Sequence, residues 1–298
     1  MNLDAYLERI GYAGPRTPTL ETLRAITRLH ATTIPFENLS VLVDGPPDLE
    51  LPALEAKLVD AGRGGYCYEQ NGLLAAALVA LGFGVKELSA RVRHGVPPDV
   101  VTPRSHRLMS VETPDGLAFA DVGFGGLTLT APVMLRWHEE QDTPHERVRL
   151  VPAGDDFLLQ ALVGEAWTDV YRFDLAVHLP PDYVQQNWHT ATRPNGLFGN
   201  NLIAAMPMPE GRYALFNRTL TWRSLAGEKE RTEVRSKAEL REVLGELFSI
   251  EASAAELDRV AERQRAVRVV AKPVARHRVG QRAIAIELVA RRIDTALQ

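Results

Sequence analysis

Apolar positions in the first eighty or so residues recur with the spacing of helices. Leucine and isoleucine return every three or four positions over residues 3–10, 20–29 and 51–62. The same period continues from residue 67 to 81 and stops at Gly82, as expected of a glycine at a helix C-terminus. These patterns predict that the first part of the chain is helical.

Beyond Gly84 the pattern changes to short alternating or β-branched runs, separated by turn residues. Such runs predict antiparallel strands over residues 85–92, 107–111, 117–122, 147–151, 157–163 and 167–173. The middle of the chain, residues 84–190, is therefore expected to form a β-barrel or sandwich. One or two further hairpins are predicted over 213–234, and helices over 237–247 and 252–265. An arginine-rich tail follows.

Composition narrows the class of protein. With 298 residues, 45% of them apolar and 24% charged, the chain has the make-up of a soluble globular protein. A net charge of -4 gives no reason to expect nucleic acid or an anionic membrane as a partner. A single cysteine forms no internal disulfide, and neither a signal peptide nor a spanning apolar run is evident. We therefore expect a cytoplasmic protein.

The single cysteine stands in the run Arg63-Gly64-Gly65-Tyr66-Cys67, at the start of a predicted helix. A lone cysteine is commonly a small core residue. A helix N-terminus, however, favours an anion such as a thiolate, and the glycines before it allow a substrate carbonyl to approach the backbone. The position predicts a nucleophile, which needs a base and a group that orients the base.

Among eight histidines, His106 stands out because it begins a strand that turns back through Thr113-Pro114-Asp115-Gly116. If the loop is the two residues Pro114 and Asp115, then His106 and Asp121 share one face of the hairpin, within side-chain reach. A three-residue loop would reverse this parity. Asp121 also ends an apolar run, where a carboxylate needs a partner.

The segment that follows, Asp121-Val122-Gly123-Phe124-Gly125-Gly126, is a second glycine-rich turn. It is either a tight barrel corner or a turn whose N–H groups and aromatic ring contact a ligand. It does not match the dinucleotide fingerprint, which requires a strand before it and a helix directly after it.

Taken together, these motifs resemble those of the arylamine N-acetyltransferases. The resemblance rests on 34–39 (Ile-Pro-Phe-Glu-Asn-Leu), 63–71, His106 and 121–126, in matching order over roughly residues 1–275. It implies an α+β fold with a helical domain over 1–83, an antiparallel β-barrel over 84–190, and an α/β lid with a basic extension over 191–298. The core would resemble that of cysteine proteases.

The resemblance also implies a catalytic triad of Cys67, His106 and Asp121. Family members are acyltransferases of xenobiotic metabolism. They take an acetyl group from acetyl-CoA as a thioester on the cysteine and pass it to an arylamine or hydrazine, in a ping-pong mechanism. No tightly bound cofactor and no metal are expected.

Other roles follow from the same resemblance. Tyr66, Phe124 and Phe198 would line the acceptor pocket, and Gly123, Phe124 and Gly125 would contact the coenzyme arm. Arg63 and Glu37 would form a structural ion pair beneath the site. The preferred acceptor, the acyl length, the oligomeric state and the role of the tail after residue 265 stay open.

Three alternatives remain at this point. An amide synthase of the same fold, which closes a macrolactam from a carrier-bound polyketide, would keep the same triad. A papain- or transglutaminase-like hydrolase also uses a Cys–His pair, but lacks the Arg-Gly-Gly prefix together with the later Gly-Phe-Gly-Gly. A non-catalytic binding module would have an inert thiol.

Overall fold

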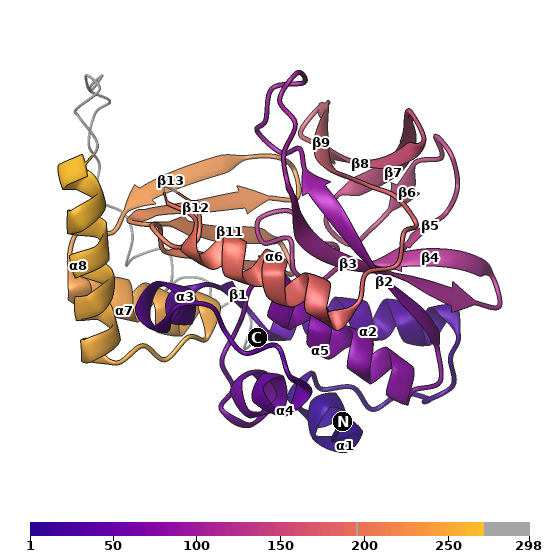
Figure 1. Ribbon diagram of the computed structural model, residues 1–298, viewed down its shortest axis with the longest axis horizontal. Coiled ribbons are helices and arrows are strands. Elements are labelled where there is room, and N and C mark those ends of the chain that lie inside the picture. The colour runs from indigo at the N-terminus through magenta and orange to yellow at the C-terminus, as the bar shows by residue number, and fades with distance from the viewer. Residues whose placement is uncertain (195, 271–298) are drawn as a thin grey trace, which may run out of the picture.

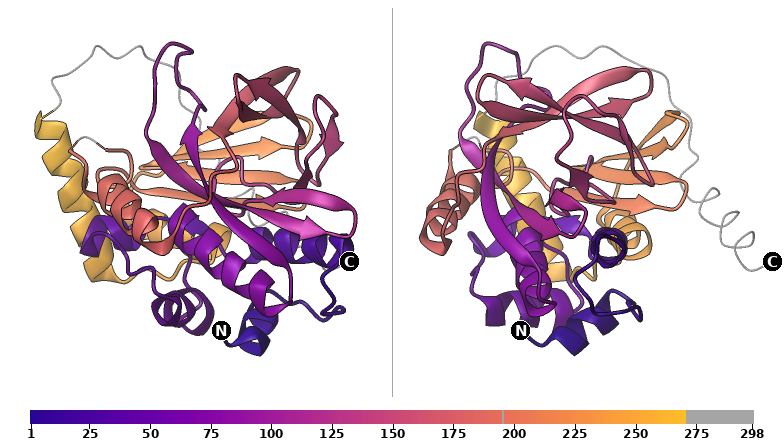
Figure 2. Two further views of the ribbon diagram at one scale, coloured as in Figure 1. Left: turned by 45° about the vertical axis from the view of Figure 1, so that its right-hand side comes forward. Right: turned by 90° about the vertical axis from the view of Figure 1, so that its right-hand side faces the viewer.

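The computed structural model describes residues 1–194 and 196–270. Along the chain it contains a set of helices, an eight-stranded sheet and a second, smaller sheet. The N-terminal helices lie below both sheets, the smaller sheet to the left and the larger one to the right (Figure 1). In both views of Figure 2 the N-terminal helices again lie below the sheets. The α+β class expected from the sequence is confirmed.

The N-terminal part is built around one helix. Its elements are α1 (Leu3–Arg9), α2 (Leu20–Thr33), α3 (Leu39–Asp44), α4 (Leu51–Leu54), the π-helical turn η1 (Glu55–Asp60) and α5 (Cys67–Ala80). Leu73, Leu74 and Leu78 of α5 are fully buried, among α1, α2 and one face of the larger sheet. Because α5 is apolar on nearly every side, it is the central helix of the molecule.

The larger sheet is antiparallel throughout, in the order β5-β4-β3-β2-β9-β8-β7-β6. Its strands are β2 (Gly84–Val92), β3 (Arg104–Thr113), β4 (Gly116–Ala120), β5 (Val133–Met134), β6 (Gln141–Asp142), β7 (Arg147–Ala153), β8 (Asp156–Val163) and β9 (Ala166–Phe173). The six predicted strands are thereby confirmed as β2, β3, β4, β7, β8 and β9. The sheet curls into a nearly closed barrel around aromatic residues, among them Phe119, Phe157 and Phe173.

The β3–β4 hairpin fixes the faces of the two strands. Thr113 pairs with Gly116 and Glu112 with Leu117, so that the loop consists of Pro114 and Asp115. This is the two-residue loop on which the sequence argument depended. The strand faces therefore alternate as expected.

The smaller sheet, which we call the lid sheet, has the order β1-β10-β11-β12-β13. Its strands are β1 (Phe36–Glu37), β10 (Ile203–Met208), β11 (Gly211–Phe216), β12 (Thr219–Ser224) and β13 (Lys229–Glu233). The helices α7 (Lys237–Phe248) and α8 (Ala254–Val270) cover it, with a core that includes Leu240, Leu244 and Phe248. The lid sheet thus takes its first strand from the helical N-terminal part.

The sequence pattern missed several elements, among them α6 and β10. Helix α6 (Pro180–Thr192) buries Tyr183, Asn187 and Ala191, while Val184 and Trp188 on its other side are exposed. Since a polar residue is buried and large apolar ones face outward, the helix has no clear apolar stripe. Strand β10 was also missed, whereas the predicted hairpins and both C-terminal helices are confirmed.

The basic extension expected after residue 265 lies almost entirely outside the described residues. Within residues 1–194 and 196–270, no helix is both long enough and apolar enough to cross a bilayer.

Candidate active site

Cys67 is the first residue of α5, and its side chain is buried at the base of a cavity. The turn before it is pressed against the N-terminal part of the lid sheet. A Cβ atom at Gly64 would lie 2.2 Å from the carbonyl oxygen of Pro35, which no other residue would tolerate without a backbone shift. The glycine therefore allows the tight turn that presents the thiol at the helix N-terminus.

His106 on β3 and Asp121, just after β4, form a buried pair. The His106 Nε2 and Asp121 Oδ2 atoms lie 2.7 Å apart, and both side chains are almost completely buried. The other carboxylate oxygen, Oδ1, accepts hydrogen bonds from Asn71 Nδ2 at 2.8 Å and from the Gly123 N–H at 2.9 Å. Asp121 is thus held on both oxygens and fixes the orientation of the imidazole ring.

Charge complementarity outweighs burial in this pair. Burial lowers the pKa of His106, but the charge and hydrogen bond of Asp121, together with contact with Cys67, raise that pKa to about 10. Burial likewise raises the pKa of Asp121, yet the charge of His106 and the hydrogen bonds that Asp121 accepts hold it below its usual range. The pair therefore favours the imidazolium–carboxylate state.

The thiol lies beside this pair. Cys67 Sγ is 3.9 Å from the carbonyl oxygen of Ser105, the residue before His106. Both Cys67 and His106 line the same cavity. With Nε2 bonded to Asp121, the free nitrogen of the ring, Nδ1, is left for the thiol proton.

The cavity has a volume of about 630 Å³ and lies between the barrel, the lid sheet and the start of α5. Phe36 and Phe198, whose ring centroids lie 6.1 Å apart, form one wall, and Phe124 lines the cavity beside His106. Tyr66 lies behind this wall, fully buried, with its ring edge-on to Phe198 and its hydroxyl donating to Asn187. Tyr66 therefore supports the wall from behind and does not line the cavity itself.

The glycine turn after Asp121 forms the floor beside the thiol. Gly123, Phe124 and Gly126 line the cavity. Gly125 has a positive φ of 82° and packs against the ring of Phe36. The Phe124 ring stands edge-on to His106, with centroids 5.2 Å apart, so that it covers the imidazole on the cavity side.

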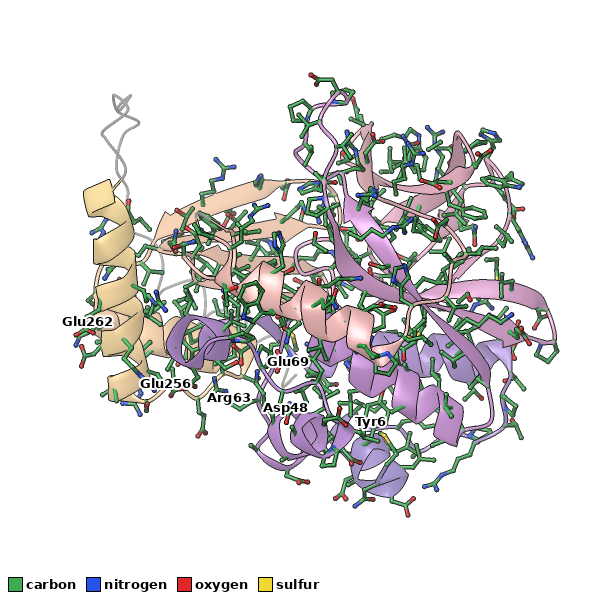
Figure 3. The ribbon with its side chains drawn as sticks, in the orientation of Figure 1. Tyr6, Asp48, Arg63, Glu69, Glu256 and Glu262 are labelled. Atoms are coloured by element: carbon green, nitrogen blue, oxygen red, sulfur yellow. The ribbon has the colours of Figure 1, made fainter. Side chains whose placement is uncertain are left out.

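Arg63 and Glu37 form the ion pair that the motifs implied, with Nη2 and Oε1 3.3 Å apart and Glu37 fully buried. Arg63 Nη1 also reaches Glu256 on α8, at 3.1 Å (Figure 3). Burial lowers the pKa of Arg63, but the charges of both carboxylates raise it above its usual value. Arg63 thus ties the cysteine turn to the C-terminal helix.

Two residues at the site were missed by sequence reasoning. Asn71, one turn after Cys67, donates to Asp121 and accepts from the Val122 N–H at 2.9 Å. The helical spacing of four was a signal that could have found it, because it places Asn71 on the same face as Cys67. Tyr171 packs on His106, with ring centroids 5.0 Å apart, and comes from β9, so that no local signal pointed to it.

Among the described residues no group of three or more His, Cys, Asp or Glu side chains could hold a metal ion. The assembled groups are a thiol, an imidazole and a carboxylate in contact, the arrangement that activates a sulfur nucleophile for acyl transfer.

Known proteins with similar sequences belong to one family of acetyltransferases. A protein-family model described as N-acetyltransferase matches residues 19–257. The arylamine N-acetyltransferase of Escherichia coli (strain K12) is 40% identical over 249 residues, which cover 83% of this chain and 88% of that protein. The protein of the same description from Mycolicibacterium smegmatis is 41% identical over 255 residues, with 84% and 92% covered.

Solved structures show the same likeness. The structure of Mycobacterium marinum arylamine N-acetyltransferase in complex with CoA superposes with a TM-score of 0.84 at 36% identity. The match covers 88% of this chain and 99% of that one.

Proposed function

The chain belongs to the arylamine N-acetyltransferase family, and we propose that it carries an acetyl group from acetyl-CoA through a thioester on Cys67 to an arylamine or hydrazine. It is accordingly an acyltransferase, and acetyl-CoA is a substrate and not a resident cofactor. The observation that carries the proposal is the contact of Cys67, His106 and Asp121 at the base of one cavity.

In the first half-reaction His106 takes the proton of the Cys67 thiol, and the sulfur attacks the carbonyl carbon of acetyl-CoA. The carbon–sulfur bond to the coenzyme then breaks, and the CoA sulfur leaves with the proton from His106. Asp121 holds the ring and stabilises its positive charge during both transfers. Backbone N–H groups near Cys67 stabilise the oxyanion of the tetrahedral intermediate.

In the second half-reaction the acceptor nitrogen attacks the acetyl carbon on Cys67. His106 removes a proton from the nitrogen, and the sulfur leaves as the new amide bond forms. Donor and acceptor thus use the same cavity in turn, as a ping-pong mechanism requires.

We assign the acceptor wall to Phe124 and Phe198, with Tyr66 supporting it from behind. The turn of Gly123, Phe124 and Gly125 approaches the thioester arm. Aromatic side chains suit a flat aromatic amine, since they stack on it and exclude water from the thioester.

We also divide the chain into a helical domain over 1–83, a barrel over 84–190 and a lid over 191–298. Because the chemistry needs a reduced thiol, we infer a reducing, cytoplasmic compartment. The matched relatives named above are all arylamine N-acetyltransferases, and they give the amide-synthase alternative no support.

The test is to mix the protein with acetyl-CoA without acceptor and to measure the intact mass. A gain of one acetyl group, absent in Cys67→Ala of unchanged fold, is the expected result. Adding arylamines, hydrazines or hydrazides should then discharge the thioester and release the amide. A folded Cys67→Ala variant that still turns over would contradict the covalent route.

A further inference from the structure

Two residues outside the triad join the chain next to the thiol to the chain next to the imidazole. Arg107 directly follows His106 on β3. Tyr68 directly follows Cys67, in the first turn of α5. Arg107 Nη1 donates to the Tyr68 carbonyl oxygen at 3.0 Å, in a buried contact. A single hydrogen bond therefore connects the neighbours of the nucleophile and of its base.

The main chain of Arg107 is bonded to the same helix. Asn71, one turn after Cys67, donates from Nδ2 to the Arg107 carbonyl oxygen at 2.5 Å. The first turn of α5 is thus bonded to both the side chain and the main chain of Arg107. We call these two contacts, Arg107 to Tyr68 and Asn71 to Arg107, the Arg107 clamp.

The guanidinium group of Arg107 is held in one orientation. Successive side chains of a strand point to opposite faces, so Arg107 points away from the face of His106. Arg107 Nε donates to Glu87 Oε2 on β2 at 2.6 Å. Its Cζ atom lies 4.3 Å from the ring centroid of Tyr183 on α6. Contacts with β2, α5 and α6 therefore fix this almost fully buried group.

The stability of α5 alone does not account for the clamp. The N-terminal end of a helix favours anions, so a cation beside the first turn opposes the macrodipole. Gly72 lies inside α5, where glycine is destabilising. A Cβ atom there would lie 2.7 Å from Arg107 Nη1 and 3.3 Å from its Cζ, so the glycine leaves room for the guanidinium group. Helix α5 is less stable for both reasons, and the contact is better explained by the site that the helix carries.

We propose that Arg107 is a positioning residue, which sets the distance between the Cys67 thiol and the His106 imidazole by clamping the first turn of α5 to β3. The inference rests on the proposed function, because it takes these two groups as the reacting pair. Arg107 is not among the described residues that line the cavity, so it acts through the helix and the strand. Proton transfer needs the two atoms within about 2.6–3.2 Å, and a misplacement of about 1 Å can cost about 100-fold in rate.

The test compares Arg107→Lys and Arg107→Met with wild type. Lysine keeps the charge, but its single nitrogen cannot hold Glu87 and the Tyr68 carbonyl oxygen together as the planar fork does. Methionine removes both bonds and keeps an unbranched apolar stem. We expect the single-turnover rate of acetylation, per folded protein, to fall at least about tenfold in each variant.

The matched control is Arg104→Met, on the same strand. Arg104 donates to the Ser89 carbonyl oxygen on β2 at 2.7 Å and forms an ion pair with Asp174, and neither acceptor belongs to α5. Its loss should lower the melting temperature and leave acetylation at the wild-type rate. The control therefore shows what the loss of a bonded arginine on β3 does when the clamp is intact.

Alkylation of Cys67 by iodoacetamide gives a readout that a purely structural role would not move. It is unambiguous, because Cys67 is the single cysteine of the chain. A thiol in contact with its base stays reactive below pH 7, whereas a free thiol ionises near pH 8.5. Below the melting temperature, the ratio of the alkylation rate at pH 6 to that at pH 9 should fall at least about tenfold in Arg107→Lys and stay unchanged in Arg104→Met.

Gly72→Ala tests the same contact from the helix side, and it keeps the test decisive where Arg107→Met does not fold. The added methyl group displaces the guanidinium group, so the alkylation ratio should fall as in Arg107→Lys. Adding Gly72→Ala to Arg107→Met should cause no further fall, since the contact is already lost. A wild-type ratio in both Arg107→Lys and Gly72→Ala would overturn the proposal.

Alkylation needs no acetyl-CoA, which keeps the two proposals apart. If the alkylation ratio falls in Arg107→Lys but wild type acetylates no amine, the clamp is supported and the proposed function is contradicted. If wild type acetylates amines and Arg107→Lys matches it in both rate and ratio, the proposed function is supported and the clamp is contradicted.

Discussion

Gly123 backs directly onto Cys67: a Cβ atom at Gly123 would lie 2.7 Å from Cys67 Cα and 2.9 Å from Asn71 Nδ2. Atoms of α5 thus already occupy the space that a side chain at position 123 would need. The approach holds the turn after Asp121 against α5, and it couples the barrel to Cys67.

Gly123→Ala should therefore damage both stability and activity. The added methyl group forces the turn away from α5, an overpacking that costs about 1–3 kcal/mol. Melting temperature and acetyl-CoA turnover measure the two effects. Gly126→Ala is the matched control, since a Cβ there meets nothing within 4 Å, and it should melt at the wild-type temperature. Equal melting temperatures for both variants would show that the close approach is relaxed in solution.

Asp121→Asn should keep the fold and lose most of the activity. The amide cannot stabilise the imidazolium and favours the wrong tautomer of His106. In serine proteases the corresponding change lowers kcat by about 10⁴-fold. Circular dichroism checks that the fold is kept, and single-turnover acetylation measures the loss of activity. Near-normal acetylation in a folded variant would remove Asp121 from the mechanism.

The His106–Asp121 pair should also make stability depend on pH. Burial lowers the pKa of His106, but Asp121 raises it to about 10, above the unfolded value of about 6.5. The histidine therefore stabilises the fold fully below pH 6.5, and this contribution is lost as pH rises toward 10.

The measurement is melting temperature against pH for wild type and Asp121→Asn. The advantage of wild type should be largest near pH 6 and shrink steadily toward pH 10. His189→Gln, which removes an exposed histidine, should keep the wild-type profile. A difference that does not vary with pH would mean that the pair is neutral in the folded protein.

Arg63→Ala should destabilise the fold. It leaves the fully buried Glu37 without its cation, and removing one partner of a buried pair typically costs about 3–5 kcal/mol. Because Arg63 is partly exposed, we expect the lower end of that range. Activity should fall with stability, since the cysteine turn loses its tie to α8.

The control for Arg63 is Arg259, an arginine on helix α8. Arg259→Ala breaks an exposed ion pair with Asp44, and exposed pairs contribute about 0–1 kcal/mol. Chemical denaturation of both variants gives the comparison. If both variants lose the same free energy of unfolding, Glu37 must find another partner when Arg63 is removed.

Local signals in the sequence were enough to place Cys67 at a helix start and to place His106 and Asp121 on one face of a hairpin. The position of Cys67 at a helix start can be predicted from the residues next to it in the sequence. The shared face of His106 and Asp121 follows from one short loop, Pro114–Asp115, and the structure has that loop. Both inferences use contacts within a few residues or across one hairpin.

What the sequence pattern did not reveal depends on distant segments. A two-residue strand such as β1 has no periodicity to detect, and its partner β10 lies more than 160 residues away. Arg212, Arg223 and Lys229 lie opposite one another only through the register of three strands. Tyr66 illustrates the same limit, because only the packing of α6 and Phe198 shows that it lies behind the cavity wall.

The place of β1 in the lid sheet has a consequence for synthesis on the ribosome. Phe36 forms a bridge to Gly65, two residues before Cys67, and it also pairs with Ala205 on β10. Until the chain has been made as far as Met208, the strand beside the cysteine turn lacks its neighbour. Cys67 is synthesised well before β10, so the nascent chain must hold the thiol in an unfinished site until that strand has emerged.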